Sequence, residues 1–195
     1  MDTADARPAA IPRGQTRPPL VSVGMVLFLG SELMFFAALF AMYFTLRAQS
    51  TAWPPRGVEL DLPTAAVFTI FLGLSSRTMQ LAIRSIRDDS RPRMKRWIWV
   101  TSLLGAVFLA GQGYGYATLN FDVSSGAYGS AFYTMTGFHA LHVLAGLVLM
   151  LVALGRAAAG AYSSQEHGGL EAIAYYWHFV DVVWIGLFST IYLIR

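Results

Sequence analysis

The 195-residue sequence contains no cysteine and few charged residues. The absence of cysteine excludes disulfide bonds, thiolate metal sites and cysteine nucleophiles. Only 13% of the residues are charged, whereas 55% are hydrophobic and 14% are aromatic. This balance is typical of a membrane protein with several spans and does not fit a soluble domain.

The sequence contains several long hydrophobic runs. A helix needs about 20 apolar residues to cross the hydrocarbon core of a bilayer. Five segments meet this requirement: about 20–46, 63–86, 97–119, 130–155 and 171–194. Short connections with proline, glycine or serine separate them. We therefore predict an all-α fold, with a five-helix transmembrane domain over residues 20–195.

Residues 1–19 differ in composition from the rest of the chain. They contain four prolines and three arginines, and we predict a disordered cytoplasmic tail. They lack the apolar core and the small-residue cleavage site of a signal peptide. The first hydrophobic run is therefore expected to remain as a membrane span.

Basic residues are distributed unevenly between the connections. Ten precede the first span, lie around the second connection or follow the fourth span: Arg7, Arg13, Arg17, Arg84, Arg87, Arg91, Arg93, Lys95, Arg96 and Arg156. Only Arg47, Arg56 and Arg195 lie on the other side. The positive-inside rule then places the N-terminus in the cytoplasm and the C-terminus in the periplasm. The basic second connection is interpreted as a cytoplasmic anchor near anionic lipid headgroups, and nucleic acid is not expected as a partner.

Glu32 lies about a dozen residues into the first span, near the expected centre of the bilayer. Ionisable groups at this depth are costly and must face protein, water or a lipid headgroup. Two interpretations of Glu32 stay open: a lipid-binding or protonatable residue, and a neutral acid hydrogen-bonded between helices. Arg77 in the second span is uncertain, since it can extend to the cytoplasmic surface, serve a proton pathway or pair with Glu32.

Two pairs of polar residues with a spacing of three occur in the last two spans. His139 and His142 share one helix face, and His178 and Asp181 share another. Such residues suit a metal site or an axial haem ligand only if the two helices face each other at one depth. Interhelical polar contacts explain them more simply, so we predict such contacts and no metal site.

Glycines occur inside the third span, at Gly111, Gly113 and Gly115. The spacing of Gly111 and Gly115 predicts a close approach of two helices, whereas a phosphate-binding loop follows a strand. No Ser-His-Asp arrangement or carboxylate pair indicates hydrolysis, and we predict no catalytic residue.

Three segments carry motifs more specific than hydrophobicity. They are SELMFFAALFAMYF (31–44), GAYGSAFYTMTGFHALHVLAG (126–146) and YYWHFVDVVWIGLFSTIY (175–192). In this order they closely resemble subunit III of the haem–copper respiratory oxidases, of the five-helix bacterial type. The resemblance extends from about residue 22 to the end of the chain.

The resemblance implies a non-catalytic subunit of a proton-pumping terminal oxidase in the bacterial plasma membrane. Such a subunit carries no haem or copper, which belong to partner subunits I and II. It stabilises subunit I, binds phospholipid and supports proton uptake, and a larger respiratory supercomplex is a further partner. Glu32 matches the family's intramembrane glutamate, and His139, His142, His178 and Asp181 match polar positions of its last two helices. Longer members have two additional leading spans, so the family's lipid cleft is in question here.

Several alternatives stay open at this point. Cytochrome c is the favoured electron donor, and a quinol is the other. The accessory protein of nitric oxide reductases shares the fold. A small proton-coupled transporter using Glu32 and Asp181 calls for inverted repeats or broken helices, and the sequence has neither. An independent haem or metal enzyme requires a chromophore or metal in the isolated chain.

Overall fold

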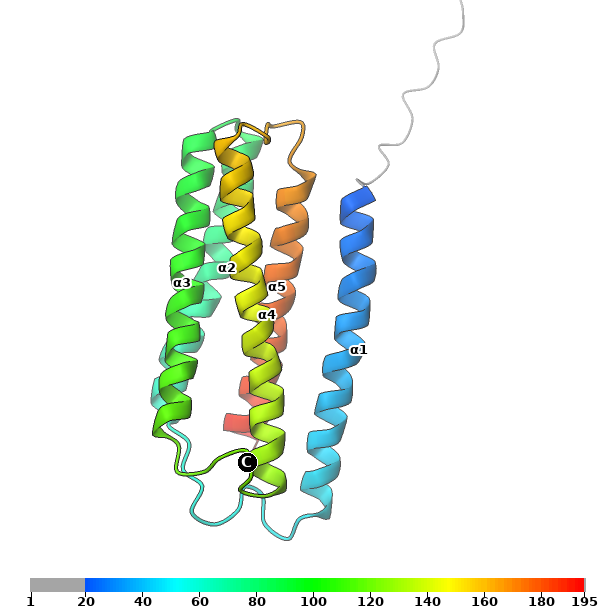
Figure 1. Cartoon of the computed structure of the whole chain (residues 1–195), viewed down its shortest axis with the longest axis vertical. Coiled ribbons are helices and arrows are strands. Elements are labelled where there is room, and N and C mark those ends of the chain that lie inside the picture. The colour runs from blue at the N-terminus through cyan, green and yellow to red at the C-terminus, as the bar shows by residue number, and fades with distance from the viewer. Residues whose placement is uncertain (1–19, 195) are drawn as a thin grey trace, which may run out of the picture.

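The computed structural model of the chain describes residues 20–194 and contains five long helices (Figure 1). They are α1 (Leu20–Gln49), α2 (Leu62–Arg87), α3 (Arg91–Thr118), α4 (Ala127–Ala158) and α5 (Gly168–Phe188), and a short π-helix, η1 (Ser189–Leu193), continues α5. All five are long and apolar enough to cross a membrane, and residues 20–194 contain no strand. The predicted all-α, five-helix fold is confirmed. The predicted tail over residues 1–19 lies outside the described residues.

The helices extend beyond several of the predicted hydrophobic segments. The third begins at Arg91 rather than near residue 97, and the fourth covers 127–158 rather than 130–155. Hydropathy marks only the part of a helix inside hydrocarbon, whereas polar residues at the membrane surface continue the same helix. Pro92 fits the first turn of α3, where a backbone N–H has no partner within the helix.

The helices run alternately up and down, so the connections gather at two ends of the bundle (Figure 1). One end holds the start of α1 and the α2–α3 and α4–α5 connections; we call it the basic end. The other end holds the α1–α2 and α3–α4 connections and the C-terminus, and we call it the C-terminal end. At the basic end, the cluster from Arg84 to Arg96 surrounds the α2–α3 connection, and Arg156 lies near the end of α4. The C-terminal end carries Arg47 and Arg56. The uneven charge of the sequence is thus a difference between the two ends of the bundle.

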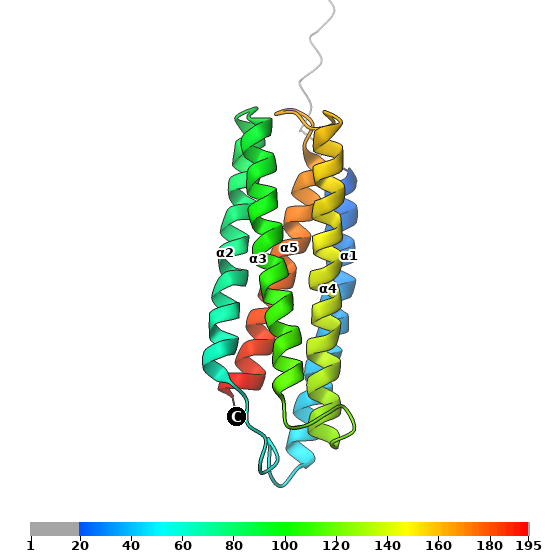
Figure 2. The same cartoon turned by 60° about the vertical axis from the view of Figure 1, so that its left-hand side comes forward.

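Helix α5 lies at the centre of the arrangement (Figure 2). It packs against α1, α2 and α4, while α2 and α3 form a closely packed antiparallel pair. Helix α1 packs against α4 and α5 and stands away from α2 and α3 (Figure 1). The bundle therefore has a four-helix body and one peripheral helix.

Trp177 on α5 organises the packing of this body. Its side chain is fully buried, and its indole N–H donates a 2.8 Å hydrogen bond to Ser75 Oγ on α2. A Cβ atom at Gly105 on α3 or at Gly146 on α4 would lie 2.6 Å from the indole ring. Two glycines therefore make room for the largest buried side chain, and the indole contacts α2, α3 and α4 together.

Candidate functional site

Glu32 and His142 join the peripheral helix α1 to α4. Glu32 Oε2 lies 3.0 Å from His142 Nε2, and both side chains are largely buried, with 20% and 17% of their surface exposed. His142 Nδ1 lies 2.7 Å from the carbonyl oxygen of Phe138, which can only accept, so Nδ1 carries a proton. The short contact at Nε2 then requires a second proton, held either by the imidazole or by the carboxyl group. The pair therefore holds one exchangeable proton inside the membrane-spanning part of the bundle.

His178 and Asp181 form a second polar cluster, between α5 and α2. His178 Nδ1 lies 2.8 Å from Ser76 Oγ, and His178 Nε2 lies 2.6 Å from Gln80 Nε2. The Ser76 hydroxyl donates to the Asp181 carboxylate. Because an amide nitrogen only donates, His178 accepts at Nε2 and donates from Nδ1 to Ser76. The cluster is a directed chain of hydrogen bonds that runs from Gln80 to Asp181.

One oxygen of this cluster lacks a partner. Asp181 Oδ1 is buried and accepts no hydrogen bond from the described residues. A buried acceptor in this state destabilises the bundle unless it is satisfied by water or by protonation of the carboxyl group.

His139 differs from the other polar residues of this region. It is fully buried, and neither ring nitrogen has a hydrogen-bond partner among the described residues. Its ring stacks on Trp184 with centroids 5.0 Å apart and meets the edge of Phe108 at 5.9 Å. The polar contact expected for His139 is therefore replaced by ring contacts with α3 and α5.

The histidines do not come together. His142 faces Glu32 of α1, His139 faces α3 and α5, and His178 faces α2. Between residues 20 and 194, no three His, Asp or Glu side chains are close enough to hold a metal ion. The arrangement gives no support to the alternative of a shared metal centre.

Arg77 faces outward from α2 and is not near Glu32. Its side chain is exposed, and it has no ion pair within residues 20–194. Glu32 pairs with His142 instead, so the alternative of a Glu32–Arg77 pair is wrong. Exposed Arg77, Gln80, Arg84 and Arg87 follow one another on α2 at spacings of three and four. We call these four residues the α2 polar stripe.

An apolar groove lies between α1 and α5. It is lined by one polar side chain and six apolar residues: His178, and Leu29, Gly30, Leu33, Phe179, Val182 and Val183. A groove of this composition suits a hydrocarbon chain, since it offers almost no hydrogen bonds.

The partners of His178 were missed by reasoning from the sequence. Ser76 and Gln80 lie four residues apart on one face of a hydrophobic helix, and this spacing was a usable signal. The spacing of Ser76 and Gln80 does not identify the helix that packs against them. It does not even require an interhelical bond, because short polar side chains in membrane helices often bond within their own helix.

The chain was compared with known proteins. The family model described as "Cytochrome c oxidase subunit III" matches residues 17–194. The chain belongs to the cytochrome c oxidase subunit III family. It is 47% identical over 183 residues to "Probable cytochrome c oxidase subunit 3" of Nocardia farcinica, covering 92% of this chain and 90% of that protein. It is 46% identical over 185 residues to "Cytochrome c oxidase subunit 3" of Corynebacterium diphtheriae, with the same coverage. For the protein of that name from Thermostichus vulcanus, the identity is 39% over 186 residues, covering 95% and 92%.

Because the chain belongs to the cytochrome c oxidase subunit III family, it is a subunit III of a terminal oxidase. It is a multi-pass membrane subunit of a multi-subunit complex. The polar clusters described above therefore lie in the membrane part of a terminal oxidase.

Proposed function

We propose that the chain is a non-catalytic subunit III that docks beside subunit I of a cytochrome c oxidase, together with subunit II. In this proposal it stabilises subunit I, holds phospholipid at the interface and supports proton uptake. Haem and copper reside in the partner subunits. Cytochrome c is the electron donor, in line with the names of the relatives.

The observation that carries the docking proposal is the exposed position of Arg77. It lies 15 residues after the start of α2 and 10 before its end, so its Cα is about 15 Å from the end of the helix at the basic end. An exposed arginine costs about 2.5–3.5 kcal/mol at the centre of a span, and part of this cost persists where the side chain has to extend along the helix to reach the surface. A partner helix with a carboxylate or a polar group at the same depth removes this penalty. Within the α2 polar stripe, Gln80 and Arg87 already bond to α5, so Arg77 and Arg84 are our candidates for contact with another subunit.

The groove between α1 and α5 supports the lipid proposal. Its wall is apolar along α1 and α5, which suits the hydrocarbon chain of a lipid. A lipid bound here would contact both α1 and α5 and so stabilise the packing of α1 against the four-helix body. Phospholipid is thus the only non-protein group that we assign to this chain.

The Glu32–His142 pair supports the proton-related proposal. It holds one proton between two groups of different helices, and both groups are partly exposed. We infer that the pair either buffers protons near subunit I or keeps α1 attached during turnover. Loss of either property shortens the working life of the complex rather than the first turnovers.

We further propose that the basic end faces the cytoplasm of a bacterial cell, with the complex in the plasma membrane. The proposal rests on the positive-inside rule and on the charge difference between the two ends of the bundle.

The first test is purification of the tagged chain from its native membranes in mild detergent. We expect subunits I and II to accompany it, a haem signal in the reduced-minus-oxidised spectrum, and oxygen consumption with reduced cytochrome c. Activity with a quinol alone would contradict the assigned donor. A chain obtained without haem subunits under several gentle conditions would contradict the docking proposal.

A matched pair of variants tests the polar stripe. Arg77→Leu is expected to lower the yield of subunit I that purifies with the chain, whereas Arg77→Lys retains most of it because the charge persists. Arg156→Leu, at the end of α4, serves as a control that removes a basic residue elsewhere. Equal yields for Arg77→Leu and the control would remove Arg77 from the interface.

A further inference from the structure

One side of α2 combines exposed apolar residues with exposed arginines. Val67, Ile70 and Leu74 are followed toward the basic end by Arg77 and Arg84, and we call these five residues the outer face of α2. Their spacings of three, four, three and seven residues are those of the seam between two nearly parallel helices. Lipid solvates the three apolar side chains without a partner, but it does not solvate the guanidinium group of Arg77.

The direction of α2 makes Arg77 harder to accommodate in lipid. The Cα–Cβ bonds of a helix tilt toward its N-terminus, and α2 begins at the C-terminal end of the bundle (Figure 1). The Cα–Cβ bond of Arg77 is therefore directed toward the bilayer centre. To reach the headgroups at the basic end, the side chain has to turn back along the helix, whose end is about 15 Å from the Arg77 Cα.

Gly73 lies one turn before Arg77, on the side toward which the Cα–Cβ bond tilts. A helical side chain covers the residue four positions earlier, so the Arg77 side chain lies above Gly73. Gly73 is exposed, and a Cβ atom placed there would meet nothing within 4 Å. Packing within residues 20–194 therefore does not require this glycine, although glycine weakens a helix relative to alanine. In membrane proteins, small residues occur where another helix comes close.

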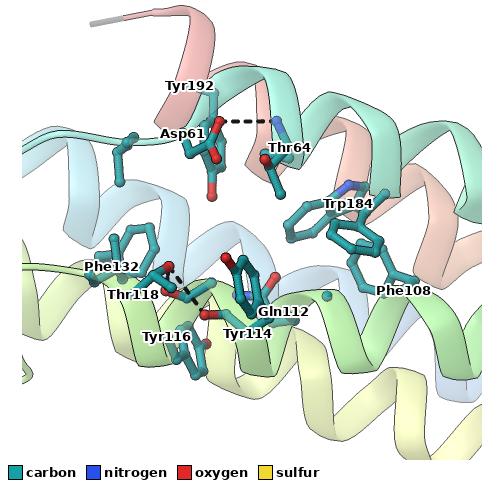
Figure 3. Close-up of a pocket in the computed structure, with 16 residues that line it drawn as sticks. Asp61, Thr64, Phe108, Gln112, Tyr114, Tyr116, Thr118, Phe132, Trp184 and Tyr192 are labelled. Carbon is teal, nitrogen blue, oxygen red and sulfur yellow. Dashed lines mark hydrogen bonds between the residues drawn. The ribbon is translucent and has the colours of Figure 1, made fainter.

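The opposite side of α2 is occupied by helices of the same chain. A Cβ atom at Gly111 of α3 would lie 2.5 Å from the ring of Phe68, so the close approach expected from the sequence occurs there. A Cβ atom at Gly115 would meet nothing within 4 Å, and this glycine lines a cavity between α2, α3 and α5 (Figure 3). The cavity measures about 60 Å³, which is enough for a few water molecules. A further helix can therefore approach α2 only at its outer face.

The chain has no carboxylate to offer Arg77 within the described spans. Glu32 lies beside His142, and Asp181 accepts a hydrogen bond from Ser76. Arg77 forms no ion pair with any residue from 20 to 194. A carboxylate that neutralises Arg77 in the membrane must therefore come from another chain.

We infer that the outer face of α2 binds one transmembrane helix of a partner subunit, and that this helix carries an Asp or Glu at the depth of Gly73 and Arg77. The close approach at Gly73 brings the carboxylate beneath the guanidinium group, and apolar residues of the partner pack on Val67, Ile70 and Leu74. Such a pair selects its partner, because each charge is costly in lipid without the other. The inference rests on the proposed docking to subunit I and specifies the chemistry of the docking helix.

Photo-crosslinking in native membranes tests which molecule covers this face. Leu74 is exposed on it, and Leu74→p-benzoylphenylalanine places the reactive group one turn from Arg77. We expect one protein adduct, mapped by mass spectrometry to a hydrophobic segment that contains Asp or Glu. Lipid adducts alone, or an adduct to a segment without a carboxyl group, would overturn the inference.

Charge reversal at two depths tests the pairing. In the crosslinking strain, Arg77→Glu is expected to lower the yield of the protein adduct about tenfold or more, because two carboxylates then meet in the membrane. Arg84→Glu is the matched control, since it makes the same change on the same face three residues from the end of α2. There the charge is close to water, and we expect a loss of less than about twofold. Equal losses for the two variants, or no loss for Arg77→Glu, would overturn the pairing.

Gly73→Leu and Gly113→Leu test the close approach of the partner helix. Both glycines are exposed in a span with open space around the Cβ, but Gly113 lies on α3. Both variants should therefore unfold at the wild-type temperature in detergent. We expect Gly73→Leu to lower the yield of the adduct from position 74 about tenfold, and Gly113→Leu to leave it unchanged. Equal yields would overturn the close approach at Gly73.

The crosslink and the copurification of subunit I can fail separately. If subunit I purifies with the wild type while position 74 forms only lipid adducts, the docking stands and the outer face of α2 does not make it. If position 74 reacts with a carboxyl-bearing span of a chain other than subunit I, the partner helix is confirmed and its assignment to subunit I is wrong.

Discussion

Helices α1 and α5 both cross the membrane region, yet they relate to the protein in opposite ways. In the most hydrophobic 18 residues of each helix, 6% are buried in α1 and 50% in α5. The more hydrophobic helix is the less buried one. In a soluble protein the reverse is expected, because water drives apolar residues inward.

The physical reason is that lipid solvates apolar side chains as well as protein does. Helix α1 can expose Leu27, Leu33 and Met34 to hydrocarbon at no cost. Helix α5 carries His178 and Asp181, which need polar neighbours, and these are provided by α2. Polar content and side-chain shape therefore decide which helix lies inside.

The contrast predicts the largest effect for a change at Trp177 on α5. Trp177→Ala removes the indole that contacts α2, α3 and α4, together with the hydrogen bond that Ser75 Oγ accepts from it. We expect the free energy of unfolding to fall by about 3–5 kcal/mol, as for other buried aromatic truncations. Thermal unfolding in detergent measures it. Ile185→Ala on the exposed face of α5 is the control. A similar loss of stability in this variant would show that burial does not decide the size of the effect.

Asp181→Leu is expected to have the next largest effect. It removes the acceptor for the Ser76 hydroxyl between α5 and α2, a contact of about 0.6–2 kcal/mol in membrane bundles. Asp181→Asn keeps the acceptor oxygen and should retain most of the stability. Wild-type thermal stability for Asp181→Leu would show that the cluster does not hold α5 in place.

Glu32→Ala tests the attachment of α1. Loss of the contact with His142 should loosen α1, by about 0.6–2 kcal/mol, and leave the rest of the bundle intact. We expect normal initial oxygen consumption by the complex, with faster loss of activity or of the subunit during turnover. Glu32→Gln, which can still hydrogen-bond to His142, is the matched control. An unchanged turnover lifetime for Glu32→Ala would remove Glu32 from this role.

The smallest effect on stability is expected at the start of α2, a helix less exposed than α1 and less buried than α5. The pKa of Asp61 is lowered by hydrogen bonds from Thr64, so its cap is complete above the ordinary carboxyl pKa of 3.8. The contribution is lost as the pH falls through the lower pKa of the folded state. Hydrogen exchange at the Thr64 amide should therefore show less protection at strongly acidic pH, relative to the intrinsic rate at each pH. Asp61→Ala should abolish this pH dependence; a dependence that persists in the variant would assign it to another group.

The polar residues of the spans show how much can be predicted from the sequence. Glu32 and His142 were each identified as polar residues in a span, but their pairing was not, because it depends on α1 packing against α4. The same holds for His139, which shares a helix face with His142 by spacing and yet meets only aromatic rings. One helical spacing of three allows two side chains about 60° apart, which is enough to reach different neighbours.

Local composition determined the five helices, their order and the charge difference between the ends of the bundle, because these depend on hydrophobicity and basic residues along each segment. The three quoted motifs determined the family. Only the tertiary structure decided that α1 is peripheral, that Arg77 faces outward, and that Gly115 opens a cavity while Gly111 closes against Phe68. These features depend on which helix lies opposite each residue, and in a membrane this is decided by the fit of small and polar side chains rather than by hydrophobicity.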